Sequence, residues 1–122
     1  MIVRMWHGRV LTTKADAYRE FVNERAIPDY QSVKGNISVY ILERREGDIT
    51  HFIILTFWEN LEAIKGFTGD EVEVAKYYPE DKDFLLEFEP NVVHYEVVGY
   101  STSLPIPLST PKGAPIKEEG SK

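Results

Sequence analysis

Two alternating stretches, residues 36–42 and 50–58, constrain the fold of this chain more than any other feature. Both have the period of two that is typical of β-strands, and a short turn around Gly47 separates them. Alternating stretches joined by so few residues form an antiparallel hairpin, so they predict the centre of a β-sheet.

The two faces of this predicted hairpin differ in their residues. The first face is aliphatic and aromatic throughout: Ile37, Val39, Ile41, Ile53, Leu55 and Phe57. The second face mixes polar and aromatic residues: Asn36, Ser38, Tyr40, Phe52, Thr56 and Trp58. A sheet face that meets water carries charged residues, and the second face carries none. We therefore predict that it lines a cavity or a subunit interface.

The N-terminal part of the chain predicts a strand and a helix before the hairpin. Residues 2–10 alternate as a strand, and Thr13 with an acid three residues later is a capping signal. The helix that follows has an apolar stripe over residues 18–26, and Pro28 is expected to disrupt or kink it.

The C-terminal part predicts a second helix and a last strand. Asn60 is expected to cap the helix and Gly69 to end it. Residues 70–78 are expected to add a helical segment, and residues 91–100 alternate as a strand. The order strand-helix-strand-strand-helix-strand is that of the ferredoxin-like α+β fold, an antiparallel sheet with two helices on one face.

Composition predicts one folded domain and a tail. The chain has 122 residues and 43% hydrophobic content, which suits one domain over residues 1–100. Residues 101–122 hold four of the seven prolines, so we expect an extended Pro-rich tail that lies on a partner subunit as an arm. The sheet face without helices is expected to be buried in a homodimer, because a large exposed apolar patch marks an interaction site.

Several classes of function are excluded or disfavoured. The chain has no cysteine, which excludes disulfides and thiolate metal sites and fits a reducing cytoplasm. No apolar run reaches the roughly 18 residues of a membrane helix. The net charge is -6, so we expect no binding to nucleic acid. His7 and His51 are expected near a sheet edge and at the surface, and no histidines have HxH or HxxxH spacing, so no metal site is predicted.

Three segments carry a resemblance to a known family: IPDY at 27–30, FWENLEAI at 57–64 and AKYYPED at 75–81. They resemble the antibiotic biosynthesis monooxygenase-type domain of the dimeric α/β barrel superfamily, over residues 1 to 100 and without the tail. The resemblance implies two ferredoxin-like subunits packed sheet to sheet. It also implies a cavity, either between the sheet and the helices or at the open face of the sheet.

The resemblance implies cofactor-independent oxygenation of a small aromatic substrate. A phenol or anthrol is deprotonated and its anion reacts with oxygen, so the protein supplies a base, a dry cavity and aromatic walls. His94 is the candidate catalytic base, since histidine titrates near neutral pH, and Glu96 would orient it from the same face. The alternative is a structural histidine hydrogen-bonded to a neighbour.

The candidate substrate-binding residues combine polar contacts with aromatic walls. Arg4 would hold an acidic group, and a tyrosine would close the pocket as a hydrogen-bond donor. The alternatives are an ion pair for the arginine and ordinary packing for the aromatic residues. The full set is Arg4, Trp6, Tyr40, Thr56, Phe67, Tyr77 and Tyr78.

Haem-degrading relatives use an asparagine on the first strand, a tryptophan on the second helix and a histidine after it. The corresponding region here offers Gly8, Phe67 and Tyr77 or Tyr78, so that chemistry is not predicted. Haem ligation by His94 stays open as an alternative. Two further alternatives are a non-catalytic protein that holds a metabolite and an aromatic face that serves dimerisation alone.

Overall fold

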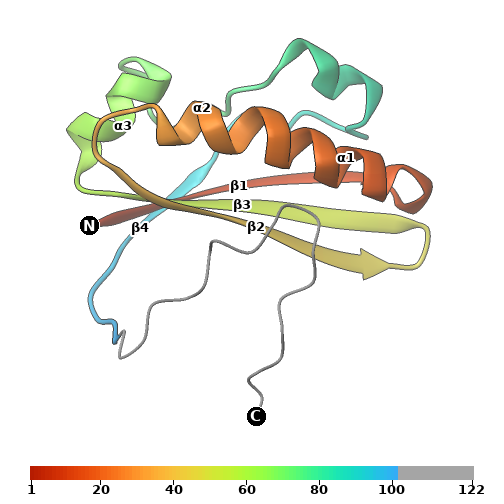
Figure 1. Ribbon diagram of the computed structural model, residues 1–122, viewed down its shortest axis with the longest axis horizontal. Coiled ribbons are helices and arrows are strands. Elements are labelled where there is room, and N and C mark those ends of the chain that lie inside the picture. The colour runs from red at the N-terminus through yellow and green to blue at the C-terminus, as the bar shows by residue number, and fades with distance from the viewer. Residues whose placement is uncertain (102–122) are drawn as a thin grey trace.

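Four antiparallel strands form one sheet in the order β2-β3-β1-β4 in the computed structural model (Figure 1). The strands are β1 (Ile2–Leu11), β2 (Asn36–Glu46), β3 (Ile49–Trp58) and β4 (Val93–Glu96). This order confirms the ferredoxin-like α+β fold. The structure describes residues 1–101, so the predicted arm at 102–122 lies outside the described residues.

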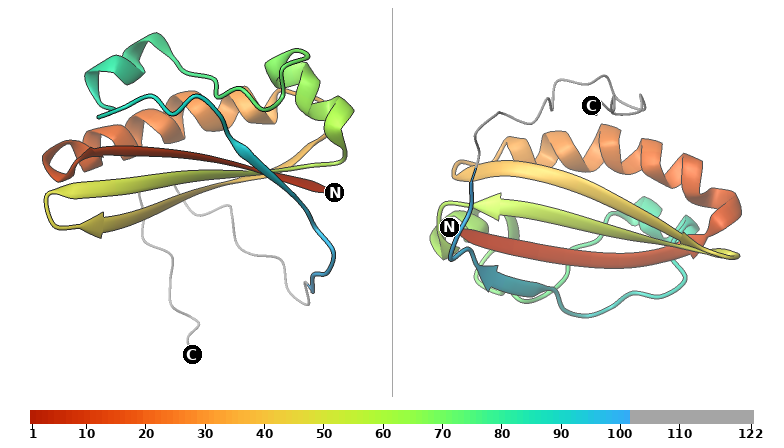
Figure 2. Two further views of the ribbon diagram at one scale, coloured as in Figure 1. Left: turned by 180° about the vertical axis from the view of Figure 1, so that it is seen from behind. Right: turned by 90° about the horizontal axis from the view of Figure 1, so that it is seen from below.

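All the helices lie on one side of the sheet, which we call the covered face; Figure 2 shows the other side, the open face, from below. One helical run comprises a 3₁₀ turn (η1, Thr12–Lys14), α1 (Ala15–Phe21), a π-helix (η2, Val22–Ala26) and α2 (Ile27–Gln31). The other helices are α3 (Leu61–Thr68) and the 3₁₀ segment η3 (Pro79–Asp83). No described helix is long and apolar enough to cross a membrane.

The helix termini follow the predicted signals only in part. Asn60 caps α3 by accepting a hydrogen bond from the backbone of Ala63, and Gly69 ends it with a φ of 82°. Thr13 is not a cap, because the chain enters α1 through a 3₁₀ turn with no side-chain capping bond. Pro28 lies where the regular α-helix is disrupted, as expected: a π-helix precedes it, and α2 begins at Ile27 with Pro28 in its first turn.

The core lies between the covered face and the helices. From the helical run it takes Tyr18, Val22, Ala26 and Tyr30, which recur every four residues. From the central strands it takes every second residue: Trp6, Val10, Phe52, Ile54 and Trp58.

The predicted pairing of the hairpin faces is wrong. A register shift between Asn36 and Ser38 places Val39 opposite Thr56, so these two residues share the covered face. Tyr40 pairs with Leu55 on the open face. One additional residue in a strand moves every following side chain to the opposite face, and the alternation of the sequence does not reveal it.

Residues 70–78 form turns and extended chain, so the predicted helical segment is wrong. Val74 forms an isolated bridge with Asn91, and the Val74 carbonyl accepts a hydrogen bond from Arg4 Nη2 at 3.2 Å. This segment therefore exchanges helical hydrogen bonds for bonds to the sheet and to the chain that leads into β4.

Candidate functional site

Three buried side-chain nitrogens have no hydrogen-bond partner in the described residues: Arg4 Nε, Trp6 Nε1 and His94 Nε2. Arg4 pairs directly with His94 between β1 and β4, and Trp6 lies two residues further along the same face of β1. All three therefore belong to the covered face. Buried polar groups nearly always have partners, so three such atoms on one small area indicate a place for the polar atoms of a ligand.

Arg4 places a positive charge in the interior. It is 1% exposed, and its hydrogen bond to Val74 uses one of five donor hydrogens. Its Cζ lies 5.6 Å from the centroid of the Phe67 ring. Burial lowers the pKa of Arg4, while the Tyr30 hydroxyl opposes that shift. The guanidinium thus has free donors and a surrounding that favours an incoming anion.

His94 is partly exposed, although its Nε2 is buried. Burial is the main cause that lowers its pKa below the ordinary value of 6.5, the charge of Arg4 adds to this, and Glu73 opposes it. The imidazole is therefore neutral near pH 7 and carries a lone pair that can accept a proton.

Glu96, the predicted orienting partner, shares the face of His94 but is exposed to solvent. It pairs with Ile2, and no hydrogen bond joins it to His94 within residues 1–101. The carboxylate whose charge raises the pKa of His94 is that of Glu73. The side chains around His94 thus supply it with a nearby cation but not with a bonded carboxylate.

Aromatic rings lie on the covered face near Arg4. Trp6 is 4% exposed and meets Tyr77 edge to face, with the ring centroids 6.0 Å apart. Phe67 is buried, and the Lys76 Nζ lies 4.2 Å from its ring centroid. Thr56 pairs with Arg4 across the sheet and accepts a hydrogen bond from Trp58. The structure therefore brings together six of the predicted residues: Arg4, Trp6, Thr56, Phe67, Tyr77 and His94.

Two predicted binding residues lie elsewhere. Tyr40 is on the open face, where its ring packs 5.8 Å from that of Phe57, because of the register shift in β2. Tyr78 donates a hydrogen bond to Asp29 at 2.7 Å, and its ring packs against Phe21 of the helical layer. Burial raises the pKa of Tyr78. Its hydroxyl is thus already engaged.

Tyr30 also lies at this site, although it was not among the predicted residues. Its ring packs 4.4 Å from that of Phe67, and its hydroxyl faces Arg4. Burial raises the pKa of Tyr30 to about 12, although the charge of Arg4 acts in the opposite direction. A signal was present, because Tyr30 extends the apolar stripe of the helix by one more step of four residues beyond Pro28.

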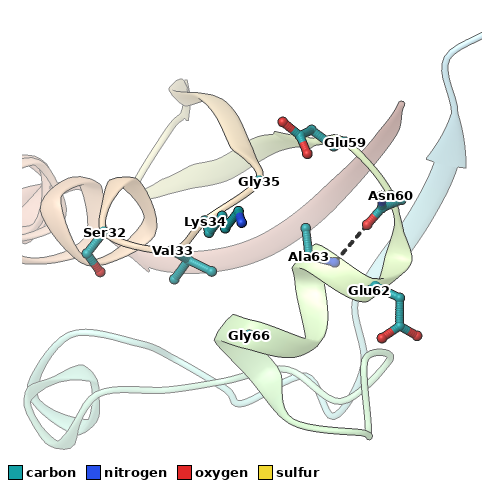
Figure 3. A pocket seen from close by; sticks show the side chains of 9 residues that line it. All are labelled: Ser32, Val33, Lys34, Gly35, Glu59, Asn60, Glu62, Ala63 and Gly66. Atoms are coloured by element: carbon teal, nitrogen blue, oxygen red, sulfur yellow. Dashed lines mark hydrogen bonds between the residues drawn. The ribbon is translucent and has the colours of Figure 1, made fainter.

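A separate open groove of about 640 Å³ lies between the chain that enters β2 and the first turns of α3 (Figure 3). Its walls bring two segments into close contact, since a Cβ at Gly35 would lie 2.4 Å from that of Ala63. None of the predicted site residues lines it. Its lining is Ser32, Val33, Lys34, Gly35, Glu59, Asn60, Glu62, Ala63 and Gly66. It contains no unpartnered buried polar side-chain atom, so we interpret it as a structural junction.

The chain is similar to known proteins in sequence and in fold. The profile of the antibiotic biosynthesis monooxygenase family matches residues 1–72. A putative antibiotic biosynthesis monooxygenase from Bacillus cereus is 14% identical, with 84% of this chain and 97% of that chain covered and a TM-score of 0.60. Another from Nitrosomonas europaea is 17% identical, with 81% and 100% covered and a TM-score of 0.59.

A third solved structure is a mutant of MhuD with two manganese protoporphyrin IX molecules bound per active site. It is 15% identical, with 84% of this chain and 100% of that chain covered and a TM-score of 0.56. At these identities the three structures show a shared fold. No curated protein matches the chain in sequence.

Proposed function

This chain belongs to the antibiotic biosynthesis monooxygenase family, and we propose that it is a cofactor-independent monooxygenase-like protein acting on a small aromatic substrate at the covered face. One observation carries the proposal: Arg4 Nε, Trp6 Nε1 and His94 Nε2 are buried on one face of the sheet without partners among residues 1–101. An aromatic molecule with an acidic hydroxyl would supply the polar atoms that these nitrogens lack.

The first step in this proposal is removal of a proton. His94 accepts the proton of the substrate hydroxyl at Nε2, because its lowered pKa keeps the ring neutral near pH 7. Arg4 stabilises the anion that forms, and an ion pair is stronger in a dry interior than in water. Trp6 and Phe67 hold the planar rings of the substrate.

The second step needs no reductant other than the substrate. In an anthrol, the enol form of an anthrone, the anion reacts with O₂ at the ring carbon opposite the oxygen. One oxygen atom stays on that carbon as a new carbonyl group. The second oxygen leaves as water, and its two hydrogens are the two that the anthrone carbon loses. One of them moves to the hydroxyl when the anthrol forms, passes to His94 as a proton and is then returned to the departing oxygen. The products are therefore a quinone and one water molecule.

We derive no step through haem, because the packing beside β1 leaves no room for the first-strand asparagine of the haem-degrading relatives. A Cβ added at Gly8 would lie 2.5 Å from Trp6 Cη2 and 2.9 Å from Leu85 Cδ2. The position where haem-degrading relatives place an asparagine is therefore filled by a tryptophan ring.

The exposure of Glu96 favours a second candidate function. With no carboxylate bonded to it, His94 lacks the partner that orients a catalytic imidazole. The same three nitrogens would then hold an acidic aromatic metabolite without turnover.

We also propose that the open face is buried in a homodimer. Large hydrophobic side chains are exposed on it at β4, including Val93 at 49% and Tyr95 at 55%. Arg9, His51 and Arg44 lie opposite one another towards the other end of the strands, so the proposed contact is centred near β4. Location in the cytoplasm stays a prediction from the absence of cysteine.

Oxygen consumption in the presence of anthrone and a panel of dihydroxynaphthalenes tests the catalytic proposal. We expect uptake above the buffer rate with formation of the quinone, and a loss of at least about 100-fold in His94→Gln, the scale of general base catalysis. Tyr40→Phe, on the open face, is the matched control and should keep the wild-type rate.

Quenching of tryptophan fluorescence separates the two candidate functions. Binding without oxygen uptake would favour the non-catalytic protein, and retained turnover in His94→Gln would remove His94 from the mechanism. If none of these compounds binds and none causes oxygen uptake, the proposal of a site for acidic aromatic molecules is contradicted.

A further inference from the structure

Four side chains on the open face form one continuous chain of hydrogen bonds. Glu89 Oε2 lies 2.6 Å from His7 Nδ1, His7 Nε2 lies 3.0 Å from His51 Nδ1, and His51 Nε2 lies 2.9 Å from Glu46 Oε1. His7 is on β1 and His51 on β3, as diagonal neighbours across the sheet. Their rings are nearly parallel, with centroids 5.3 Å apart.

When both histidines are neutral, each ring carries one N–H proton, and two protons cannot make three hydrogen bonds between these four side chains. An ionised carboxylate only accepts, so Glu89 holds the Nδ1 proton of His7 and Glu46 holds the Nε2 proton of His51. When both rings are neutral, two lone pairs therefore face each other across 3.0 Å. A positive ion between them would remove this repulsion.

We propose that His7 Nε2 and His51 Nδ1 bind a divalent transition metal ion, with copper(II) as the preferred ion. Imidazole is a common ligand of copper, nickel and zinc. A ligating histidine typically donates its other N–H to a carboxylate, and both histidines here do so. Such carboxylates fix the tautomer and the ring orientation, so each ring keeps its lone pair on the nitrogen that is next to the other histidine.

The distance between the two nitrogens favours copper(II) or nickel(II) over zinc. With metal–nitrogen distances of about 2.0–2.1 Å, a separation of 3.0 Å corresponds to an angle of roughly 90° at the metal. That angle suits adjacent ligands in a square-planar or tetragonal complex, whereas zinc prefers the wider tetrahedral angle.

The surrounding charges also favour a cation. Three carboxylates, those of Glu46, Glu87 and Glu89, lie in this cluster beside two arginines. Arg9 pairs with Glu87 at 2.7 Å, while Arg44 is 3.8 Å from Glu46. The cluster is thus negative when both imidazoles are neutral. The side chains of His7 and His51 are 29% and 19% exposed, so an ion from solution can reach them.

The protein supplies two ligands to this ion. Within residues 1–101 no group of three or more His, Cys, Asp or Glu side chains could hold a metal. Solvent molecules would therefore fill the remaining positions around the ion. The site is an open two-histidine chelate, independent of the function proposed for the covered face.

Titration of the untagged full chain with copper(II) chloride, followed by calorimetry, tests the proposal. We expect one ion per chain, with affinity at least 10-fold lower in His7→Ala and in His51→Ala. Glu89→Gln should weaken binding about 10-fold through the imidazole that it orients. The chain has three histidines and no cysteine, so His94→Ala is a matched control and should bind as the wild type does. Nickel(II) should bind more weakly than copper(II).

A measurement on the wild-type protein keeps the test valid if a variant fails to fold. Paramagnetic copper(II) should broaden the ring proton resonances of two histidines at substoichiometric amounts and leave the third sharp. Equal broadening of all three resonances would overturn the proposal. So would loss of binding in His94→Ala alone, or a wild-type affinity no higher than that of the double variant H7A/H51A.

Discussion

The covered and open faces of the sheet hold their histidines in opposite ways. On the covered face His94 has a buried Nε2 without a partner, beside a buried arginine. On the open face each of His7 and His51 contacts a carboxylate through one ring nitrogen and the other histidine through the second. The carboxylates of this cluster outnumber its two arginines. The first arrangement has a positive charge without a carboxylate among the described residues, whereas the second has more carboxylates than arginines. The two faces are therefore suited to ligands of opposite charge.

The largest expected difference between the faces is in packing. Trp58→Ala removes a side chain with 0% exposure and should lower the free energy of unfolding by about 3–5 kcal/mol. Phe57→Ala, one residue earlier on the open face, should lower the free energy of unfolding by less, because Phe57 is only partly buried. The measurement is urea unfolding at low protein concentration. Equal losses that increase with protein concentration would show that a second chain covers the open face.

A smaller effect is expected at Gly8, where the covered face has no free space. Gly8→Ala would place a Cβ 2.5 Å from Trp6 Cη2 and should cost about 1–3 kcal/mol by overpacking. Adding Trp6→Phe should recover at least about 0.5 kcal/mol in thermal unfolding, since the two residues are in contact. Gly99→Ala, with no atom within 4 Å of the added Cβ, is the control. Additive losses at positions 8 and 6 would contradict the contact.

Two arginines test the charge of the two faces. Arg9→Met on the open face should cause a small loss of stability, and 1 M salt should remove it, because the pair with Glu87 is partly exposed. Arg4→Met on the covered face should be neutral or stabilising at any salt concentration, since it removes a buried charge that has no carboxylate partner. A salt-dependent loss in Arg4→Met would indicate an ion pair instead.

The smallest expected effect is on the pH dependence of stability. The pKa of His94 is lowered in the folded chain, so the unfolded chain binds its proton more readily. The stability contributed by the neutral ring is present above pH 6.5 and is lost as the pH falls through the folded pKa. Urea titrations from pH 7.5 to 5 should therefore show a shallower decline in His94→Gln than in the wild type. An identical decline in the variant and the wild type would show that folding does not lower the pKa of His94.

The order and type of the elements could be predicted because their signals are local. Alternation around Gly47, the cap at Asn60 and the stop at Gly69 each concern a few neighbouring residues. The register shift at the start of β2 and the path of residues 70–78 could not be predicted, because both depend on bonds to distant segments.

The candidate site was predictable to the extent that strand parity allows. Arg4, Trp6 and His94 share a face because they are spaced by even numbers of residues along paired strands. Their catalytic or binding role stays a proposal. Tyr40 could not be placed by parity, since one irregular residue in β2 reverses its face.

By itself, the sequence determined the fold class, the caps of α3 and the parity of β1, because periodicity and end signals act within a few residues. Only the tertiary structure decided which phase of β3 the helices cover, and that His7 meets His51 across 44 residues of sequence. The physical reason is that register and layer packing are set by contacts summed over the whole sheet. A period of two in a single strand therefore leaves both faces equally available.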